Sequence, residues 1–188
     1  SVALLATPDL ATVARLGVTD AIERAEAEGL VDTSGGRVRF AHPLFSAAMV
    51  ARLTPSQRRR AHARLATVVD DPTQAAVHAA RAAVGPDAAV ARRLIDAAGS
   101  VASRGAIDNA ADFAELAVRL TPEDDDALTQ RIIVAAELAF QAGDTDATAA
   151  MLAELERVAE GGALPAHTRY AEQLLRAKVE FSAGSARR

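Results

Sequence analysis

The histidines are the side chains of this sequence that could most directly carry acid–base or metal chemistry. His42 and His62 are far apart along the chain, and neither has a carboxylate beside it at metal-ligand spacing. A buried imidazole, or one that caps a helix, is therefore favoured over a metal ligand or a proton-transfer group. His78 and His167 are isolated in helix-forming segments, and we expect them to be structural or solvent-exposed.

A run of consecutive carboxylates, Glu123 to Asp126, could suggest a calcium site. The run lacks the alternating ligand spacing of a calcium-binding loop. It follows Thr121 and Pro122, which are typical of a helix start, where the helix dipole favours negative charge. We therefore interpret these carboxylates as the N-terminal turn of a helix.

Three common catalytic motifs are absent from the sequence. A phosphate-binding loop needs glycines followed by Lys and Ser or Thr, but the single lysine, Lys178, lies in a predicted helix. Neither G-x-S-x-G nor H-E-x-x-H occurs. We therefore predict no catalytic residue, no cofactor-binding residue and no metal ligand in this chain, and hence no enzyme activity. An enzyme would require a polar pocket with converging titratable groups.

The composition favours a globular, mainly helical protein. The chain has 188 residues, of which 50% are hydrophobic, but only five are Phe, one is Tyr and none is Trp. Its cores must therefore be built from Leu, Val, Ile and closely packed Ala, a composition that favours helices. Because cysteine is absent, disulfides and thiolate sites are excluded, and a cytoplasmic location is the simplest interpretation. Neither a membrane span nor a leader peptide is visible, and the net charge of -4 implies no partner by itself.

The elements expected before residue 41 are two short helices and a hairpin. Asp9 can cap a helix that Gly17 ends, and Thr19 or Asp20 can begin a second one that stops at Gly29. Two short strands should follow, Leu30-Val31 and Arg37 to Phe40, joined by a turn with two consecutive glycines. This order is typical of a winged helix. Because the chain begins within an apolar element, we expect it to belong to a longer protein.

The charge of the second helix argues against DNA binding. The helix that would enter the major groove carries a single arginine among acidic residues, which are Asp20, Glu23, Glu26 and Glu28. Duplex DNA requires neutralisation of its phosphates. We therefore expect a packing role for this module and no direct contact with nucleic acid.

Two helices are predicted after the hairpin. Pro43 suits the first turn of a helix, which we expect to be mostly buried through its apolar residues, Leu44, Phe45, Ala47, Ala48, Met49, Ala51 and Leu53. Thr54 can cap the next helix, whose inner face is formed by Ala61, Leu65 and Val68. The Asp70-Asp71-Pro72 break then suggests two domains, 1–71 and 72–188.

An arginine cluster on these helices could bind nucleic acid or phosphate. Its members are Arg52, Arg58, Arg59, Arg60 and Arg64. A solvated helix face, whose arginines pair with acidic neighbours such as those of the second helix, is the favoured interpretation.

The stretch Phe40-Ala41-His42-Pro43-Leu44, with the run Arg58 to Ala66, carries a family resemblance. It is similar to the F-x-H-P-L and R-R-x-x-H-x-x-L-A segments of large ATP-binding LuxR-type transcriptional regulators, which belong to the STAND class of AAA-type signal-transduction ATPases. The matching residues are Phe40, His42, Pro43, Leu44, Arg59 and His62, together called the hinge signature below. The resemblance implies a winged helix between a P-loop ATPase and helical repeats, a LuxR-type DNA-binding domain, and ATP as the cofactor of the whole protein.

The remainder of the chain shows a repeated pattern. Leu94-x-x-Ala97-Ala98-x-x-Val101-x-x-x-Gly105 recurs from Ile132 to Gly143, and a weaker third copy contains Ala177 and Gly184. This pattern resembles degenerate tetratricopeptide (TPR) repeats, an α-α superhelix of helix pairs with small residues at their crossings. The third copy has one helix, Leu164 to Ala183, so we expect the natural protein to continue.

The repeats should carry the partner surface. An exposed apolar patch is expected among Leu174, Leu175, Ala177 and Phe181, and Arg169, Tyr170 and Arg176 are candidate partner-binding residues. A homodimer through exposed helix ends is possible, and no membrane partner is expected. By resemblance, the chain relays binding of an inducer or protein on its repeats to the ATPase switch; the alternative is a stand-alone TPR-like interaction scaffold.

Overall fold

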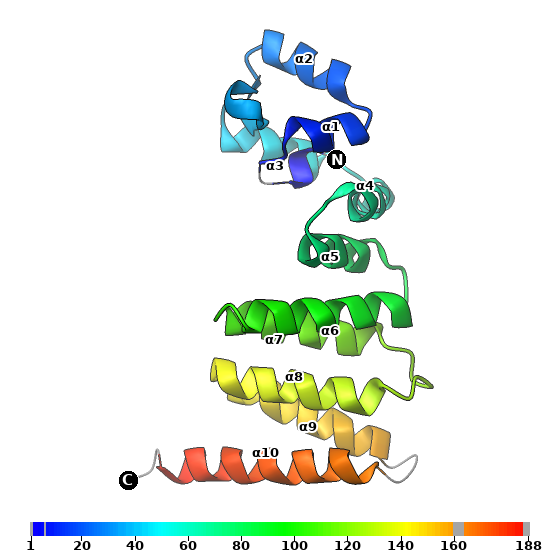
Figure 1. The fold of residues 1–188 in the computed structure, drawn as a ribbon, viewed down its shortest axis with the longest axis vertical. Helices are drawn as coiled ribbons and strands as arrows, with labels where there is room; N and C mark the ends of the chain where they lie inside the picture. The colour runs from blue at the N-terminus through cyan, green and yellow to red at the C-terminus, as the bar shows by residue number, and fades with distance from the viewer. Residues whose placement is uncertain (1, 6, 160–163, 186–188) are drawn as a thin grey trace. The chain divides into compact units, whose positions relative to one another are not determined.

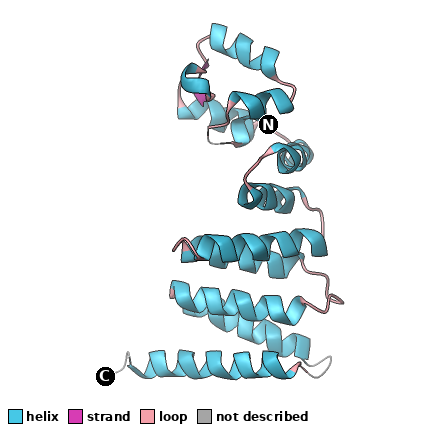
Figure 2. Ribbon diagram, in the orientation of Figure 1, coloured by secondary structure: helices cyan, strands magenta, loops and turns pink. Residues whose placement is uncertain are grey.

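The computed structural model describes residues 2–5, 7–159 and 164–185, and they form a mainly helical protein with one small antiparallel hairpin (Figures 1 and 2). The chain divides into two compact units, Ser1–Val84 and Gly85–Arg188. The expected predominance of helix and the presence of a hairpin are confirmed. No helix of the described residues is both long enough and apolar enough to span a membrane.

The first unit begins with short helices around the hairpin. Its elements are η1 (Val2–Leu4), α1 (Leu10–Arg15), α2 (Thr19–Ala27), β1 (Val31–Asp32), η2 (Ser34–Gly36), β2 (Arg39–Phe40), α3 (Pro43–Ala51), α4 (Pro55–Val68) and α5 (Pro72–Ala82). Asp9 caps α1 as predicted, because its Oδ1 accepts the Thr12 N–H at 2.6 Å. In the hairpin, Val31 pairs with Phe40 and Asp32 with Arg39.

The core of the first unit joins these elements to α4. Its buried members are Val2, Val13, Leu16, Ile22, Val31, Val38 and Leu65. Leu65 of α4 is completely buried, in agreement with the predicted inner face. Thr54 caps α4 as predicted, since its hydroxyl accepts the Gln57 N–H while the Gln57 side chain accepts the Thr54 N–H. Helix α4 is therefore an integral part of this core.

The chain was expected to divide at residue 71, but α5, which follows that residue, belongs to the first unit. Asp71 caps α5, with its Oδ1 accepting the Thr73 N–H at 2.7 Å. The helix then packs along α4, so the division of the chain falls after Val84. The Asp-Asp-Pro break thus starts a helix of the same unit, because the buried side of α5 lies against α4.

The second unit is a stack of helices in which each packs against the next, except that the last one packs mainly against the third (Figure 1). They are α6 (Ala88–Ala102), α7 (Ile107–Leu120), α8 (Leu128–Ala142), α9 (Thr145–Ala159) and α10 (Ala166–Ser185). Their shared core is Ala98, Val101, Ala110, Ala114, Val118, Leu128, Ile132, Ile133, Ala135, Leu138 and Leu155. Ala98 and Ala136, the small residues predicted at helix crossings, are both fully buried.

Two of the three predicted turn glycines occur in turns. Gly105 and Gly143 have φ of 85° and 79°, a conformation that glycine adopts without steric cost. Gly143 ends α8, and the N–H of Asp144 then returns to the carbonyl of Ala139 at 3.0 Å. The third prediction was wrong, since α10 continues through Gly184 to Ser185.

Candidate interaction surfaces

The hinge signature occupies the hairpin end, the start of α3 and the middle of α4. Phe40 lies in β2 and packs, half-buried, against the core of the first unit. His42 caps α3, because its Nδ1 accepts the Leu44 N–H at 3.1 Å, and Pro43 is the first residue of that helix. Arg59 is exposed on α4, whereas His62 is buried. The capping and buried roles predicted for the two histidines are confirmed.

The prediction that α3 is mostly buried was wrong. No residue of this helix is buried. Its large apolar side chains are turned to solvent, with Leu44 67%, Phe45 40% and Met49 56% exposed, and only Ser46 and Val50 are half-buried. The helix is apolar on nearly all sides but contacts the unit mainly through η1 and β2. These exposed side chains, Leu44, Phe45 and Met49, are called the α3 face below.

His62 of α4 and His78 of α5 form a buried pair that the sequence did not reveal. They are 4% and 5% exposed, and their Nδ1 atoms lie 2.9 Å apart. Burial lowers the pKa of His62 to about 4, helped by the positive charges of His78, Arg81 and Arg58. Burial and Arg81 also lower the pKa of His78. The neighbouring arginines disfavour a metal cation here, and the pair acts as a neutral hydrogen bond between two helices.

Two arginines of the cluster, Arg58 and Arg64, donate to backbone carbonyls. Arg64 donates to the carbonyl of Leu16, which ties α4 to the end of α1. Arg58 donates to the carbonyl of Val50 in α3 at 3.4 Å. Among the described residues no ion pair joins the cluster to a carboxylate. The expected pairing with the acidic α2 surface is therefore not what holds these arginines.

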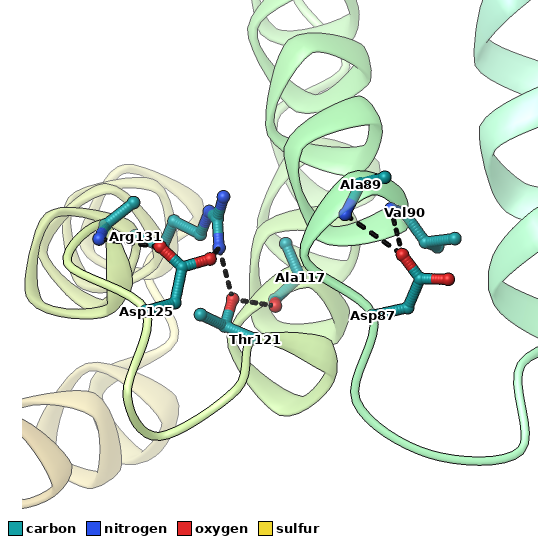
Figure 3. Close-up of polar contacts among 8 residues, drawn as sticks. Asp87, Ala89, Val90, Ala117, Thr121, Asp125 and Arg131 are labelled. Atoms are coloured by element: carbon teal, nitrogen blue, oxygen red, sulfur yellow. Dashed lines mark hydrogen bonds and ion pairs between the residues drawn. The ribbon is translucent and has the colours of Figure 1, made fainter.

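The carboxylate run at residues 123–126 lies in the turn between α7 and α8, one turn before the helix that it was expected to start. Asp125 accepts the Ala127 N–H at 2.9 Å and pairs with Arg131 at 2.9 Å. Arg131 also donates to the hydroxyl of Thr121 at 3.0 Å, and this hydroxyl donates to the carbonyl of Ala117 at 2.7 Å (Figure 3). The run thus closes a turn around an arginine that is only 8% exposed.

The neighbouring end of α6 is fixed by a second aspartate. Asp87 Oδ1 accepts the N–H groups of Ala89 and Val90, each at 3.0 Å (Figure 3). Its own N–H donates to the carbonyl of Leu120 at 2.7 Å, so the start of α6 is bound to the end of α7. These bonds cap α6 and hold its start against the end of α7.

The predicted apolar patch on α10 is largely present. Leu174 is 43% and Phe181 80% exposed, and Ala177 is exposed beside them. Leu175 departs from the prediction, because it is 1% exposed and packs with Ala136 and Leu152. The sequence could not separate these neighbours, since only the position of α8 and α9 decides which side of α10 is covered.

The three candidate partner residues do not form one site. Tyr170 is 69% exposed and Arg169 is exposed next to it. Arg176 instead pairs with Glu172 at 2.9 Å and with Glu156 of α9 at 2.5 Å. Its guanidinium therefore fastens α10 to α9, while Arg169 and Tyr170 remain on the outer side.

A groove between α7 and α9 lies over α8. It has a volume of about 400 Å³, and its floor is made of small apolar residues that include Ala135 and Ala139. Its α7 wall carries Asp108, Asp112 and Glu115. Glu115 is within 3.8 Å of Arg119. The described residues contain no group of three or more histidines and carboxylates placed to hold a metal ion.

The chain matches no protein-family model, no curated protein and no solved structure.

Proposed function

We propose that the chain is a non-catalytic signal-relay and protein-interaction region of a LuxR-type, ATP-dependent transcriptional regulator. In this proposal the first unit is a winged-helix-like module and the second a degenerate TPR-like superhelix. ATP would be bound by another part of the regulator, and an inducer or protein would bind the repeats.

The α3 face is the observation that carries the proposal. It belongs to the helix that the hinge signature begins, and its exposed side chains are Leu44, Phe45 and Met49. Contiguous apolar side chains at a surface mark sites of protein association. A relay element must bind another domain of the switch, and this face supplies an apolar surface for that contact.

Two further features support the proposal. The order helix, helix, hairpin in the first unit is that of a winged helix, and α2, with Asp20, Glu23, Glu26 and Glu28, has the charge of a packing element rather than of a DNA reader. In the second unit α6–α7 and α8–α9 are consecutive helix pairs with Ala98 and Ala136 buried at equivalent positions. Consecutive helix pairs with buried small residues are what a TPR-like repeat requires.

A stand-alone interaction scaffold is the second candidate function. It is favoured by the exposed side of α10, where Tyr170 and Phe181 are 69% and 80% exposed. A scaffold needs such a surface but has no need of an ATPase or of the hinge signature.

The test uses the complete open reading frame that contains this chain. We expect it to encode a P-loop ATPase and a LuxR-type DNA-binding domain. In the full protein, the double variant L44S M49S should lose most inducer-dependent expression from a reporter. V84S is the matched control, because Val84 is 89% exposed outside the α3 face. If the double variant were induced like the wild type, the relay role would be refuted. If the open reading frame encoded neither domain, the stand-alone scaffold would be the remaining candidate function.

A further inference from the structure

The outer side of α10 is a narrow apolar stripe. Tyr170, Leu174, Ala177 and Phe181 recur at intervals of four, three and four residues. At 3.6 residues per turn, they fall within an arc of about 60° on the helix. All four are exposed, Tyr170 at 69%, Leu174 at 43% and Phe181 at 80%. These residues are called the α10 stripe below.

The opposite side of α10 is already packed within the second unit. Thr168 and Leu175 are each 1% exposed, and Val179 lines a groove against α9. Figure 1 shows α8 and α9 on one side of α10, the side to which Leu175 is buried. A helix that is apolar on two opposite sides is normally covered on both. We therefore expect the α10 stripe to be covered by a second binding partner.

The spacing of the stripe is that of a two-helix seam. Apolar residues at alternating intervals of three and four residues meet a facing helix as knobs and holes. If two copies of α10 met antiparallel about a two-fold axis near residues 175 and 176, Tyr170 would lie against the partner's Phe181. Leu174 would then lie against the partner's Ala177. Each layer would pair either two aromatic residues or a large and a small residue, and all layers would be filled.

A parallel pairing fits less well. Each residue would meet its own copy, so that Ala177 would face the partner's Ala177 and leave a gap beside the bulkier layers. Gaps of this kind lose packing contacts that a filled layer keeps.

The charges beside the stripe agree with the antiparallel arrangement. Arg169 and Glu180 lie on the same flank of α10, near opposite ends of the stripe. Reversal of one helix brings Arg169 to within two residues, about 3 Å along the helix axis, of the level of the partner's Glu180. These long side chains can span that offset, and the two-fold axis creates the pair twice. On the other flank, Lys178 would meet the partner's Ala171, so no like charges are forced together. Complementary flanking charges set the orientation of paired helices.

We propose that the α10 stripe binds the α10 stripe of a second copy of this chain, antiparallel, in a two-fold symmetric dimer. A surface that is complementary to itself closes into a dimer without leaving a further site open. The proposal does not rest on the assignment of the chain to a regulator.

Sedimentation of the 188-residue chain over a concentration series tests the pairing. We expect the average mass of the wild type to rise toward twice the monomer mass, and L174E to remain at the monomer mass. V84E adds the same charge at a side chain that is 89% exposed elsewhere and should dimerise like the wild type. L44S M49S, on the α3 face, should also dimerise. A wild type that is monomeric throughout, or an L174E variant that still dimerises, would overturn the proposal.

Cross-linking tests the orientation. The chain has no cysteine, so Y170C and F181C each introduce a single thiol. With a short bismaleimide, the mixture of the two variants should give a cross-linked dimer, whereas each variant alone should give little. Circular dichroism on both variants checks that the helices are intact. Efficient cross-linking of each variant with itself would show parallel pairing and overturn the antiparallel arrangement.

Discussion

The Nδ1 atoms of His62 and His78 lie 2.9 Å apart in the interior of the first unit, and they join α4 to α5. In the neutral pair one Nδ1 donates its proton and the other accepts it. Protonation of both rings would point two N–H groups at each other in a buried site that Arg58 and Arg81 already make positive. The contact between α4 and α5 therefore depends on pH.

The pH dependence of stability should follow from the lowered pKa of His62. Folding lowers this pKa from 6.5 to about 4, so the unfolded chain binds the proton more tightly. The stabilisation is complete above pH 6.5 and is lost as the pH falls toward 4. The free energy of unfolding should be about 2 kcal/mol lower at pH 5 than at pH 7. Urea unfolding, followed by circular dichroism at pH 5 and at pH 7, measures this difference in the free energy of unfolding.

The matched control for this prediction is the double variant H62L H78L, which keeps apolar bulk between α4 and α5. Its free energy of unfolding should change much less between pH 7 and pH 5 than that of the wild type. An equally steep change in the variant would assign the effect to other titrating groups.

The turn between α7 and α8 should depend on the hydroxyl of Thr121. Thr121 is 5% exposed, and its hydroxyl is an acceptor for the nearly buried Arg131. T121V keeps the shape but removes this acceptor, and it should lower the free energy of unfolding by about 2 kcal/mol, as expected for a hydrogen bond to a charged group. T145V, at an exposed threonine of α9, should change it by less than about 0.5 kcal/mol. Equal effects in the two variants would contradict the role of the network.

Two apolar residues of the hinge signature, Phe40 and Leu44, should respond differently to truncation. Phe40 packs against the core of the first unit, so F40A should lower the free energy of unfolding by about 2 kcal/mol, less than at a fully buried Phe. Leu44 is 67% exposed, and L44A should change it by less than about 0.5 kcal/mol. Chemical denaturation of both variants provides the comparison, and a large loss in L44A would mean that the α3 face is covered.

Two glycine-to-alanine changes should have opposite signs. Gly143 ends α8 at φ 79°, where a Cβ is strained, and G143A should destabilise the chain by about 1 kcal/mol. Gly99 lies within α6, and a Cβ there would meet nothing within 4 Å. G99A should therefore stabilise the chain by roughly 0.5 to 1 kcal/mol. If the melting temperatures of G143A and G99A shifted in the same direction, the predicted opposite effects of the two changes would be wrong.

Local features of the fold could be predicted from the sequence. Asp9 and Thr54 cap their helices as expected, and Gly105 and Gly143 end the helices that precede them. Caps and turns bond groups only a few residues apart, so the residue types nearby are sufficient to specify them. The burial of Ala98 and Ala136 likewise follows from periodicity.

The surfaces were decided by tertiary structure. An apolar residue in a helix is buried only where another element lies against it, and the sequence of α3 does not show that Leu44 lacks such a neighbour. Leu175 is covered and Leu174 is not because α8 and α9 lie on one side of α10. His62 and His78 likewise meet only because α5 packs on α4. The sequence by itself determined caps and turns such as those at Asp9, Thr54 and Gly143, because they bond groups close together in the chain. The packing of distant segments determined which sides of the helices remain free to bind a partner.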